Sequence, residues 1–397
     1  MKVSFIASEY NPFHNGHQYH IQATRNAGAD AVVCIMSGNF VQRGSIAVCD
    51  KYLRAEMALK CGVDLVLELP VKFAISTASY FADGFVKTAA ATGLQGYISF
   101  GAVNSIELLQ ELKNIIFSDR TKSFIENECK DLSFTNAVNK CLDSNFPEKY
   151  SSLLKDANSI LAIEYIRARD LYFKDADIIS VKRNGVLHND MNTSESFASA
   201  SYLRNILYNS GTISDISAFI PDAVSEILYR SFNDGVFPAS EKQFSDLIFA
   251  RLLSKDITCY SKINNVSGGL ENRIYEAIQM SSNLEEAVYN ISTKRYPVSR
   301  IRQILLSAAL EVTKDDILNG PSYIRVLGFN DKGRELLSLM RDSAALPVIS
   351  NLSQANKLNE AAQKDAYIDN LAGKLFNLCI CSPKKGSPEY QGKPVII

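Results

Sequence analysis

Four short apolar runs, separated by longer segments, are the feature that most limits the fold of the first hundred residues. They are Val3 to Ser8, Ala31 to Met36, Asp64 to Leu69 and Gly96 to Phe100. A strand with one face in water alternates apolar and polar residues, whereas these runs are nearly continuous, which is typical of parallel strands buried on both faces. The sequence therefore predicts an α/β fold with a parallel sheet covered by helices.

The rest of the chain changes character after about residue 208. A fifth strand is predicted at Asp177 to Val181, but beyond Tyr208 helical periodicity dominates to about Leu378. Thr212 to Asp222 is the candidate linker between the two parts.

We therefore predict two domains, and composition limits what they do. Residues 1–207 form the catalytic parallel-sheet domain, and residues 208–397 form a mostly helical domain. The formal net charge is −1, so binding to a nucleic acid needs a local basic patch. No apolar run approaches the ~18 residues of a membrane span, and the eight cysteines form no C-x-x-C pair. We expect a cytoplasmic protein with no membrane partner.

The histidines are unevenly placed. Three of the four, His14, His17 and His20, lie in the first twenty residues, where HNGH follows the first predicted strand. Ligands usually bind at the carboxyl ends of parallel strands, and Gly16 lets a ligand approach the backbone closely. On the first turn of a helix His14 and His17 share a face, and the free amides there attract anions. The pattern predicts that this pair stabilises a phosphoryl group as it gains negative charge.

Two other interpretations of the histidines stay open from the residues alone. Zinc could be held by the pair, with a third ligand from Glu9, His20 or elsewhere. Alternatively, the pair could only cap and pack the start of a helix. The Asn11-Pro12 turn, the glycine and the place at a strand end favour phosphate binding over both, and we predict no resident metal site.

The motif resembles the H-x-G-H signature of the nucleotidylyltransferase superfamily, whose Rossmann-like (HUP) fold is shared with class I aminoacyl-tRNA synthetases. The surrounding segments make the resemblance more specific, and it extends into the C-terminal half. They resemble the bacterial tRNA(Met) cytidine acetate ligase family in the order EYNPFHNGH, MSGNFVQRG, DKYLRAEMAL, DLVLELP, NSILAIEY, FASASYLR and PSYIRVLGFNDKGRELL.

The resemblance implies a two-step reaction. Acetate and ATP give acetyl-adenylate and pyrophosphate, and the acetyl group then passes to the exocyclic amine of the wobble cytidine of elongator tRNA(Met), forming N4-acetylcytidine. Holding an activated acyl group beside this weak nucleophile compensates for its low reactivity. The implied partners are elongator tRNA(Met), acetate and ATP, with Mg²⁺ accompanying ATP. DNA is not expected as a partner.

The family's nucleotide-binding residues are implied at the matching positions of this chain. His14 and His17 are the implied catalytic pair, and Gly101, Asn158 and Arg183 are implied to contact the nucleotide. The first ATP-binding segment consists of Ile6, Ala7, Ser8, Glu9, Tyr10, Asn11, Pro12, Phe13, His14, Asn15, Gly16, His17, Gln18 and Tyr19.

FASASYLR occupies the place of the superfamily's second phosphate motif. There Ser199, Ser201 and Arg204 are expected to hold the β- and γ-phosphates, since hydroxyls at a helix start and an arginine one turn along suit that task. Taken alone, each of these residues also has an ordinary structural interpretation, such as helix capping.

The chain departs from the family pattern at three places. Ser159 stands where the family generally has asparagine, Ala162 where it has glycine, and NGVLHND, with His188, where it has a short glycine-containing run before a His-Asp pair. These changes affect the expected details of the adenosine pocket rather than the activation chemistry. The loop Ser37 to Gly44 is our expectation for the acetate pocket, because it follows the second strand.

Two other functions share some of these features. An adenylyltransferase of a small phosphorylated metabolite would use the same residues, but it would not need the large helical C-terminal half. A non-catalytic, ATP-dependent module that binds RNA or a partner is the other alternative, and the intact HNGH argues against it.

A basic stretch in the C-terminal half is the candidate tRNA contact. Between Glu286 and Glu311 the sequence has no acidic residue, and Tyr296 and Pro297 are expected to join two helices. An interleaved tyrosine can stack on a base, whereas an isolated basic run is more often a solvated helix end. The basic residues are Lys294, Arg295, Arg300 and Arg302.

Overall fold

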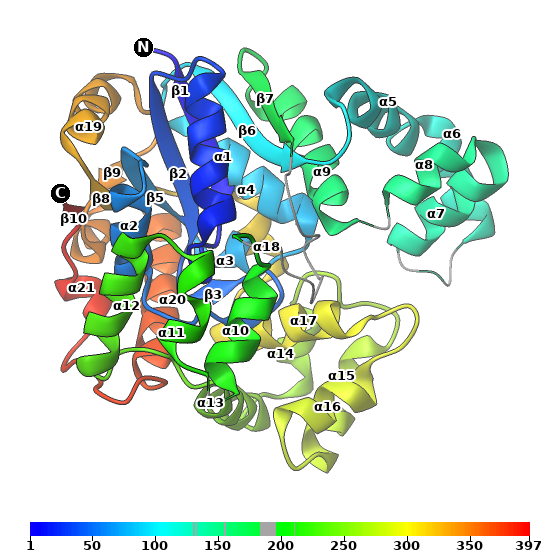
Figure 1. Ribbon diagram of the computed structural model, residues 1–397. Helices are drawn as coiled ribbons and strands as arrows, with labels where there is room; N and C mark the ends of the chain where they lie inside the picture. Colours follow the sequence, from blue (N-terminus) through cyan, green and yellow to red (C-terminus); the bar gives the residue numbers. More distant parts are fainter. Residues whose placement is uncertain (130–131, 133, 155, 183–195, 210) are drawn as a thin grey trace.

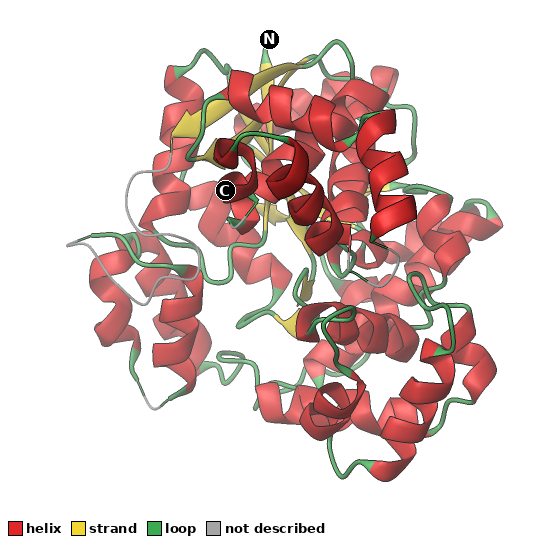
Figure 2. Ribbon diagram, turned by 90° about the vertical axis from the view of Figure 1, so that its right-hand side faces the viewer, coloured by secondary structure: helices red, strands yellow, loops and turns green. Residues whose placement is uncertain are grey.

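A computed structural model describes residues 1–129, 132, 134–154, 156–182, 196–209 and 211–397. It places an eight-stranded sheet at the centre of the molecule, with helices around it (Figures 1 and 2). The strand order is β10-β8-β5-β2-β1-β6-β7, with β9 paired to β8. The strands of this sheet are β1 (Val3–Ser8), β2 (Ala31–Ser37), β5 (Leu65–Leu69), β6 (Gly96–Ala102), β7 (Asp177–Lys182), β8 (Ile324–Phe329), β9 (Val348–Ile349) and β10 (Val395–Ile396), and β3 (Phe40–Val41) and β4 (Ser45–Ile46) form a separate hairpin.

The helices fall into three groups along the chain, and none in the described part of the chain combines the length and apolar character needed to cross a membrane. Those that alternate with the first strands are α1 (Asn15–Asn26), α2 (Lys51–Lys60), α3 (Val71–Ala74), α4 (Ala78–Ala91) and α9 (Ala157–Tyr172). A lobe beside the sheet contains α5 (Ile106–Ile116), α6 (Asp119–Glu128), α7 (Phe134–Asn145) and α8 (Glu148–Leu153) (Figure 1). The remainder are α10 (Ala200–Tyr208), α11 (Ile213–Ile216), η1 (Ser217–Phe219), α12 (Asp222–Asn233), α13 (Glu241–Leu253), α14 (Ile257–Ser261), α15 (Leu270–Met280), α16 (Leu284–Ile291), α17 (Val298–Leu310), α18 (Lys314–Leu318), α19 (Asp331–Ser343), η2 (Leu352–Lys357), α20 (Glu360–Asn377) and α21 (Pro388–Gln391).

The predicted fold class is confirmed. All five strands predicted from apolar runs are present, and each pairs in parallel with its neighbours among them. Alternate residues of these strands face opposite layers, as the two-residue period of a strand requires. Phe5 and Val33 pack into the core beneath α4 and α9, whereas Ile6 and Val32 pack into the core beneath α1 and α2.

The expectation of helical structure as far as Leu378 is wrong at Ile324–Phe329. This segment is β8, which pairs antiparallel with β5 and brings the C-terminal half into the sheet. Its sequence, IRVLGF, is short and apolar, and such a run cannot be told from a buried helical segment by its period. Pairing with an edge strand more than 250 positions away decides the matter.

The candidate linker, Thr212 to Asp222, is folded. Within Thr212 to Asp222 the chain forms α11 and η1, and Ile213, Ile216 and Ile220 are buried in the same core as α10 and α12. The stretch therefore joins the two halves through packed apolar side chains rather than through exposed chain.

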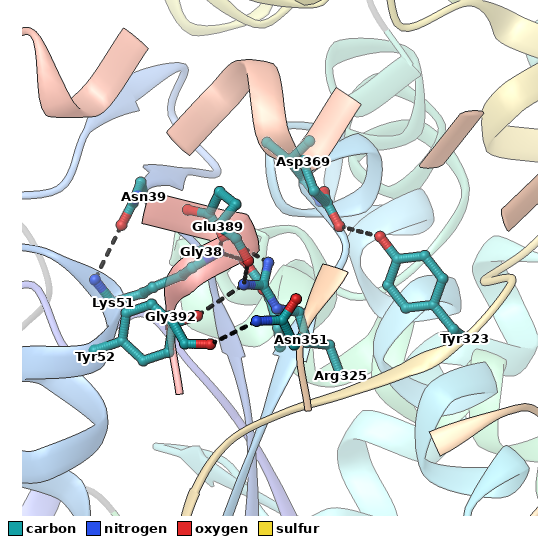
Figure 3. Close-up of polar contacts among 12 residues, drawn as sticks. Gly38, Asn39, Lys51, Tyr52, Tyr323, Arg325, Asn351, Asp369, Glu389 and Gly392 are labelled. Atoms are coloured by element: carbon teal, nitrogen blue, oxygen red, sulfur yellow. Dashed lines mark hydrogen bonds and ion pairs between the residues drawn. The ribbon is translucent and has the colours of Figure 1, made fainter. Parts of the chain in front are cut away.

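Four buried charged side chains, which we call the buried ion cluster, tie the C-terminus to the N-terminal half, and Figure 3 labels three of them, Lys51, Arg325 and Glu389. They are Lys51 on α2, Glu68 on β5, Arg325 on β8 and Glu389 on α21. Lys51 Nζ lies 2.6 Å from Glu68 Oε1 and from Glu389 Oε2, and Arg325 Nη1 lies 2.6 Å from Glu389 Oε2 and 3.1 Å from Glu68 Oε2. Burial and Arg325 act to lower the pKa of Lys51, but the two carboxylates outweigh them and raise it above its ordinary value.

The turn after β2 lies directly against this cluster. The Lys51 amide donates to Asn39 Oδ1 over 2.9 Å, and a Cβ at Gly38 would come within 2.5 Å of Glu68 Oε1. Only glycine fits there without displacing the carboxylate. The cluster therefore supports the segment that leads from β2 towards the β3–β4 hairpin.

Candidate active site

The carboxyl ends of β1 and β6 open into a cavity of about 1310 Å³. Its walls come from the start of α1, the β3–β4 hairpin, the first turn of α4, α9, the start of α10 and the start of α17, with the α5–α8 lobe on one side. Ligand pockets usually measure ~300–1000 Å³, so this cavity has room for more than one nucleotide. Both halves of the chain contribute to it.

His14 and His17 lie at the base of the cavity, where β1 leads into α1. His14 is the N-cap of α1, and its Nδ1 accepts a hydrogen bond from the Gly16 amide over 3.1 Å. His17 Nδ1 accepts one from the His14 amide over 3.2 Å, which completes a capping box. The two imidazole rings are stacked with centroids 3.7 Å apart.

These hydrogen bonds fix the tautomer of both histidines. A backbone N–H can only donate, so Nδ1 of each ring is the acceptor, and a neutral ring must then carry its proton on Nε2. Both rings consequently present an Nε2–H donor. Two donors held side by side at a helix N-terminus are suited to stabilising charge on a phosphoryl oxygen. The structure thus combines the capping interpretation of the histidines with the anion-binding one.

The loop before α1 packs against the ring of His17. Tyr10 has a φ of 46°, in the left-handed region that few residues other than glycine adopt. Its buried ring packs 4.7 Å from the Phe13 ring and 4.8 Å from the His17 ring. Asn11 Oδ1 accepts from the Val48 amide over 2.8 Å, and the Asn11–Pro12 peptide is cis. Packing therefore fixes the orientation of His17.

Most of the predicted ATP-binding segment faces the cavity, but not all of it does. Phe13 is fully buried in the core, and Asn15 Nδ2 donates to the Ser196 and Ala218 carbonyls. The members of the segment that line the cavity are Ile6, Ala7, Ser8, Glu9, Tyr10, Asn11, His14, Gly16, His17 and Tyr19. Pro12, Phe13, Asn15 and Gln18 are not among them.

Arg54 supports the floor of the site and was not singled out from the sequence. It is fully buried, and its guanidinium donates to the carbonyls of Glu9 (2.6 Å), Ser37 (3.1 Å), Gly38 and Cys49 (3.0 Å). The ends of β1 and β2 are held together in this way. An arginine within an otherwise apolar helix face was the only sequence signal for this role.

The second phosphate motif opens α10, next to the start of α1, where Asn15 Nδ2 donates to the Ser196 carbonyl. Ser199 is the N-cap and accepts from the Tyr202 amide over 3.1 Å, while Arg204 donates to the Asn11 carbonyl over 2.8 Å and to Ser201 Oγ over 3.1 Å. Ser199 and Arg204 line the cavity, whereas Ser201 does not and contacts it through Arg204. Burial lowers the pKa of Arg204, and the charge of Glu9 opposes this shift.

The other predicted nucleotide contacts come from β6 and α9. Gly101 and Asn158 both line the cavity, and Asn158 Nδ2 also bonds to Asp156 Oδ1 over 3.3 Å. Ser159, one of the departures from the family pattern, is buried and bonds to Asp156, the N-cap of α9. Ala162 lines the cavity as well. Arg183 and His188 lie outside the described residues.

The basic stretch is divided between the cavity and the surface. As predicted, it joins two helices, α16 and α17. Lys294 and Arg300 line the cavity, and the guanidinium groups of Arg295 and Arg300 lie 5.5 and 5.3 Å from the Tyr296 ring centroid. Arg302, in contrast, forms an ion pair with Glu285. Although the stretch itself contains no acidic residue, Arg302 therefore has an acidic neighbour in the folded protein.

The loop proposed for acetate also reaches the cavity. Gln42 and Arg43 line it, and the Gln42 amide donates to Glu9 Oε1 over 2.8 Å. A Cβ at Gly44, whose φ is +73°, would come within 2.7 Å of the Arg302 carbonyl carbon, so α17 packs closely on this hairpin. The place of this loop agrees with the expectation, and its role in acetate binding stays a prediction.

A metal site at the histidines gains no support. His20 Nε2 bonds to Ser99 Oγ over 2.9 Å, which ties α1 to β6. Within the described ranges, no three side chains from His, Cys, Asp and Glu gather closely enough to hold a metal ion.

A strand-end cavity with a helix-capping H-x-G-H pair defines a nucleotidyltransferase class, and the HIGH Nucleotidyl Transferase family model matches residues 1–389. The tRNA(Met) cytidine acetate ligase of Thermoanaerobacter sp. (strain X514) is 38% identical over 368 residues, covering 89% of this chain and 90% of that protein. That of Acetivibrio thermocellus is 33% identical over 419 residues, covering both chains completely. The chain therefore belongs to the tRNA(Met) cytidine acetate ligase family.

Solved structures agree with this assignment. The crystal structure of Thermotoga maritima TmcAL in its apo form matches with a TM-score of 0.93 at 33% identity, covering all of both chains. The same protein bound with alpha-thio ATP matches with a TM-score of 0.91 at 33% identity, covering 100% of this chain and 99% of that one.

Proposed function

We propose that this chain activates acetate with ATP as acetyl-adenylate and transfers the acetyl group to the exocyclic amine of the wobble cytidine of elongator tRNA(Met). The observation that carries the proposal is the stacked His14–His17 pair, whose two Nε2–H donors lie at a helix N-terminus in a large cavity. The relatives are named tRNA(Met) cytidine acetate ligase, which supports tRNA(Met) as a substrate. The alpha-thio ATP complex of Thermotoga maritima TmcAL supports ATP.

In the first step the chain's own groups position the nucleotide. His14 and His17 stabilise the α-phosphate while acetate attacks it, and Arg204 with the Ser199 end of α10 holds the leaving pyrophosphate. Gly101 and Asn158 contact the nucleoside from β6 and α9. Mg²⁺ accompanies ATP in this proposal.

In the second step tRNA occupies the open side of the cavity. Lys294 and Arg300 line that cavity from the C-terminal half, which makes residues 208–397 the proposed tRNA-binding part. Because the proposed substrate is tRNA, the proposed location of the enzyme is the cytoplasm. DNA is not a proposed partner.

The test combines two measurements. Acetate-dependent exchange of pyrophosphate into ATP reports the first step, and mass spectrometry of tRNA nucleosides after incubation reports N4-acetylcytidine. Exchange across a panel of acids and phosphorylated metabolites separates this proposal from an adenylyltransferase. A stable nucleotide product without any acetylated tRNA contradicts the proposal.

A further inference from the structure

Acetyl transfer releases a proton, and some group in the cavity has to accept it. In this step, which rests on the proposed function, the amine nitrogen forms a bond to the acetyl carbon. The bond from that carbon to the phosphate oxygen breaks, and AMP leaves with its electron pair. The nitrogen, which began with two hydrogens, must lose one. The structure restricts which side chain can take that proton.

The histidine pair is not suited to this task. Nδ1 of His14 and of His17 each accepts a backbone hydrogen bond, so Nε2 of each neutral ring already carries a proton. These rings can donate into the cavity but have no vacant nitrogen with which to accept. His20, the third cavity histidine, bonds to Ser99 Oγ through Nε2.

Three carboxylates line the described part of the cavity, and two of them are neutralised by one arginine. Asp83 Oδ1 lies 2.6 Å from Arg167 Nη2, and Glu164 Oε2 lies 2.6 Å from Arg167 Nε. Protonation of either carboxylate breaks its ion pair with Arg167. Burial raises the pKa of Glu164 and Arg167 opposes that shift, so the ion pair itself, rather than a low proton affinity, argues against Glu164.

Glu9 is the third carboxylate and differs from the other two. It lies just beyond the end of β1, on the loop that leads to His14, and makes no ion pair within 4.0 Å in the described part of the chain. Its Oε1 accepts the Gln42 amide over 2.8 Å, which orients the carboxylate. Two arginines are near enough to interact with its charge, but Arg54 donates to backbone carbonyls and Arg204 donates to a carbonyl and to Ser201.

We propose that Glu9 is the catalytic base of the second step, in which it accepts a hydrogen bond and then the proton from the cytidine amine. Carboxylates are natural partners of the N4 amine of cytosine, so the same contact selects cytidine over uridine, which has an acceptor at that position. Glu9 thereby acquires a role separate from binding ATP.

The test measures the two steps separately in Glu9→Gln, which keeps an oxygen for the Gln42 amide but cannot take a proton. Synthetic acetyl-adenylate is supplied with elongator tRNA(Met) for the second step, and acetate-dependent exchange reports the first. We expect transfer to fall by ~100-fold or more, the usual contribution of a general base, and exchange to fall at least tenfold less. Transfer within about threefold of the parent, or equal losses in both steps, overturns the proposal.

Chemical rescue and a matched control make the result specific. Formate added to Glu9→Ala is expected to restore part of the transfer rate from acetyl-adenylate, and no restoration contradicts the proposed role. Glu164→Gln removes a cavity carboxylate that is already paired, so both steps are expected to change by the same factor. Loss of the fold in both Glu9 variants also overturns the proposal, because such a loss would show that Glu9 serves to support the β3–β4 hairpin.

Failure of this inference can be told from failure of the proposed function. If the parent protein transfers acetyl to tRNA and Glu9→Gln does so equally well, only the role of Glu9 is wrong. If the parent itself transfers no acetyl group from acetyl-adenylate, the proposed function is wrong as well.

Discussion

Two sets of charged side chains in this molecule differ in how their charges are balanced. The four members of the buried ion cluster are at most 4% exposed, and each lies within 3.1 Å of an opposite charge. At the cavity, Glu9, Arg204, Lys294 and Arg300 make no ion pair with any described residue, although all four lie within the walls of one pocket.

The difference separates structural charges from functional ones. A buried charge that is already neutralised has little left to offer a ligand, and removing one partner leaves the other uncompensated. A charge held in place by backbone hydrogen bonds, as Arg204 is by the Asn11 carbonyl, keeps its electrostatic field for a substrate. Substitutions in the first set should therefore affect stability, and those in the second should affect binding and rate.

The largest effect is expected in the buried ion cluster. Arg325→Met should lower the free energy of unfolding by about 3–5 kcal/mol, because among the described residues it leaves Glu68 and Glu389 with Lys51 as their only paired cation. Urea titration measures the change. Arg230→Ala is the matched control, since its half-exposed pair with Glu56 should contribute less than ~1 kcal/mol. Equal losses of unfolding free energy in the two variants would contradict the expected difference between a buried and a surface ion pair.

Substitution of the histidine pair should lower the rate of the first step rather than the free energy of unfolding. His14→Ala and His17→Ala should each lower acetate-dependent pyrophosphate exchange by ~100- to 1000-fold, as expected when one transition-state donor is lost. His20→Gln serves as the control, because His20 bonds to Ser99 rather than presenting a donor fixed by a backbone amide. Near-normal exchange in a folded His14→Ala protein would remove that residue from the chemistry.

A smaller effect is expected at the second phosphate motif. A charge-assisted bond from arginine to phosphate contributes roughly 1.5–3 kcal/mol, so Arg204→Ala should weaken ATP binding by about 10- to 100-fold and leave tRNA binding in place. Ser201→Ala should have a weaker effect in the same direction, since Ser201 bonds to Arg204 without lining the cavity. Calorimetry with ATP and with tRNA distinguishes the two ligands. A variant that binds ATP normally but loses tRNA would refute this assignment.

The smallest effects are expected in the basic stretch. There an arginine without an ion pair to a described residue, Arg300, and a paired one, Arg302, lie on the same helix, α17. Arg300→Glu should weaken tRNA binding and flatten its dependence on salt by roughly one unit of slope, because a phosphate contact is lost. Arg302→Glu should change the slope less, since Glu285 already pairs with that arginine. Filter binding against salt concentration measures both, and acetate-dependent exchange checks that the variants remain folded. Equal slopes in the two variants would show that ion pairing does not determine the contact.

Local patterns in the sequence determined much of the fold and part of the site. Continuous apolar runs gave the five parallel strands, and their alternation with helical segments gave the layers around them. The spacing of His14 and His17 placed them on one helical turn, and a capping position is likewise local. Such features depend on residues only a few positions apart, so the chain near them contains the necessary information.

The tertiary structure alone decided contacts between distant positions. The pairing of β8 with β5, the ion pair of Arg302 with Glu285 and the four carbonyls bound by Arg54 all depend on how separate elements pack. The same packing neutralises Asp83 but not Glu9. Glu164 and Arg167 are neighbours on one turn of α9, which the sequence spacing alone allows. Asp83 lies on α4 and meets the same guanidinium only after the two helices have packed together, so no local pattern records that contact.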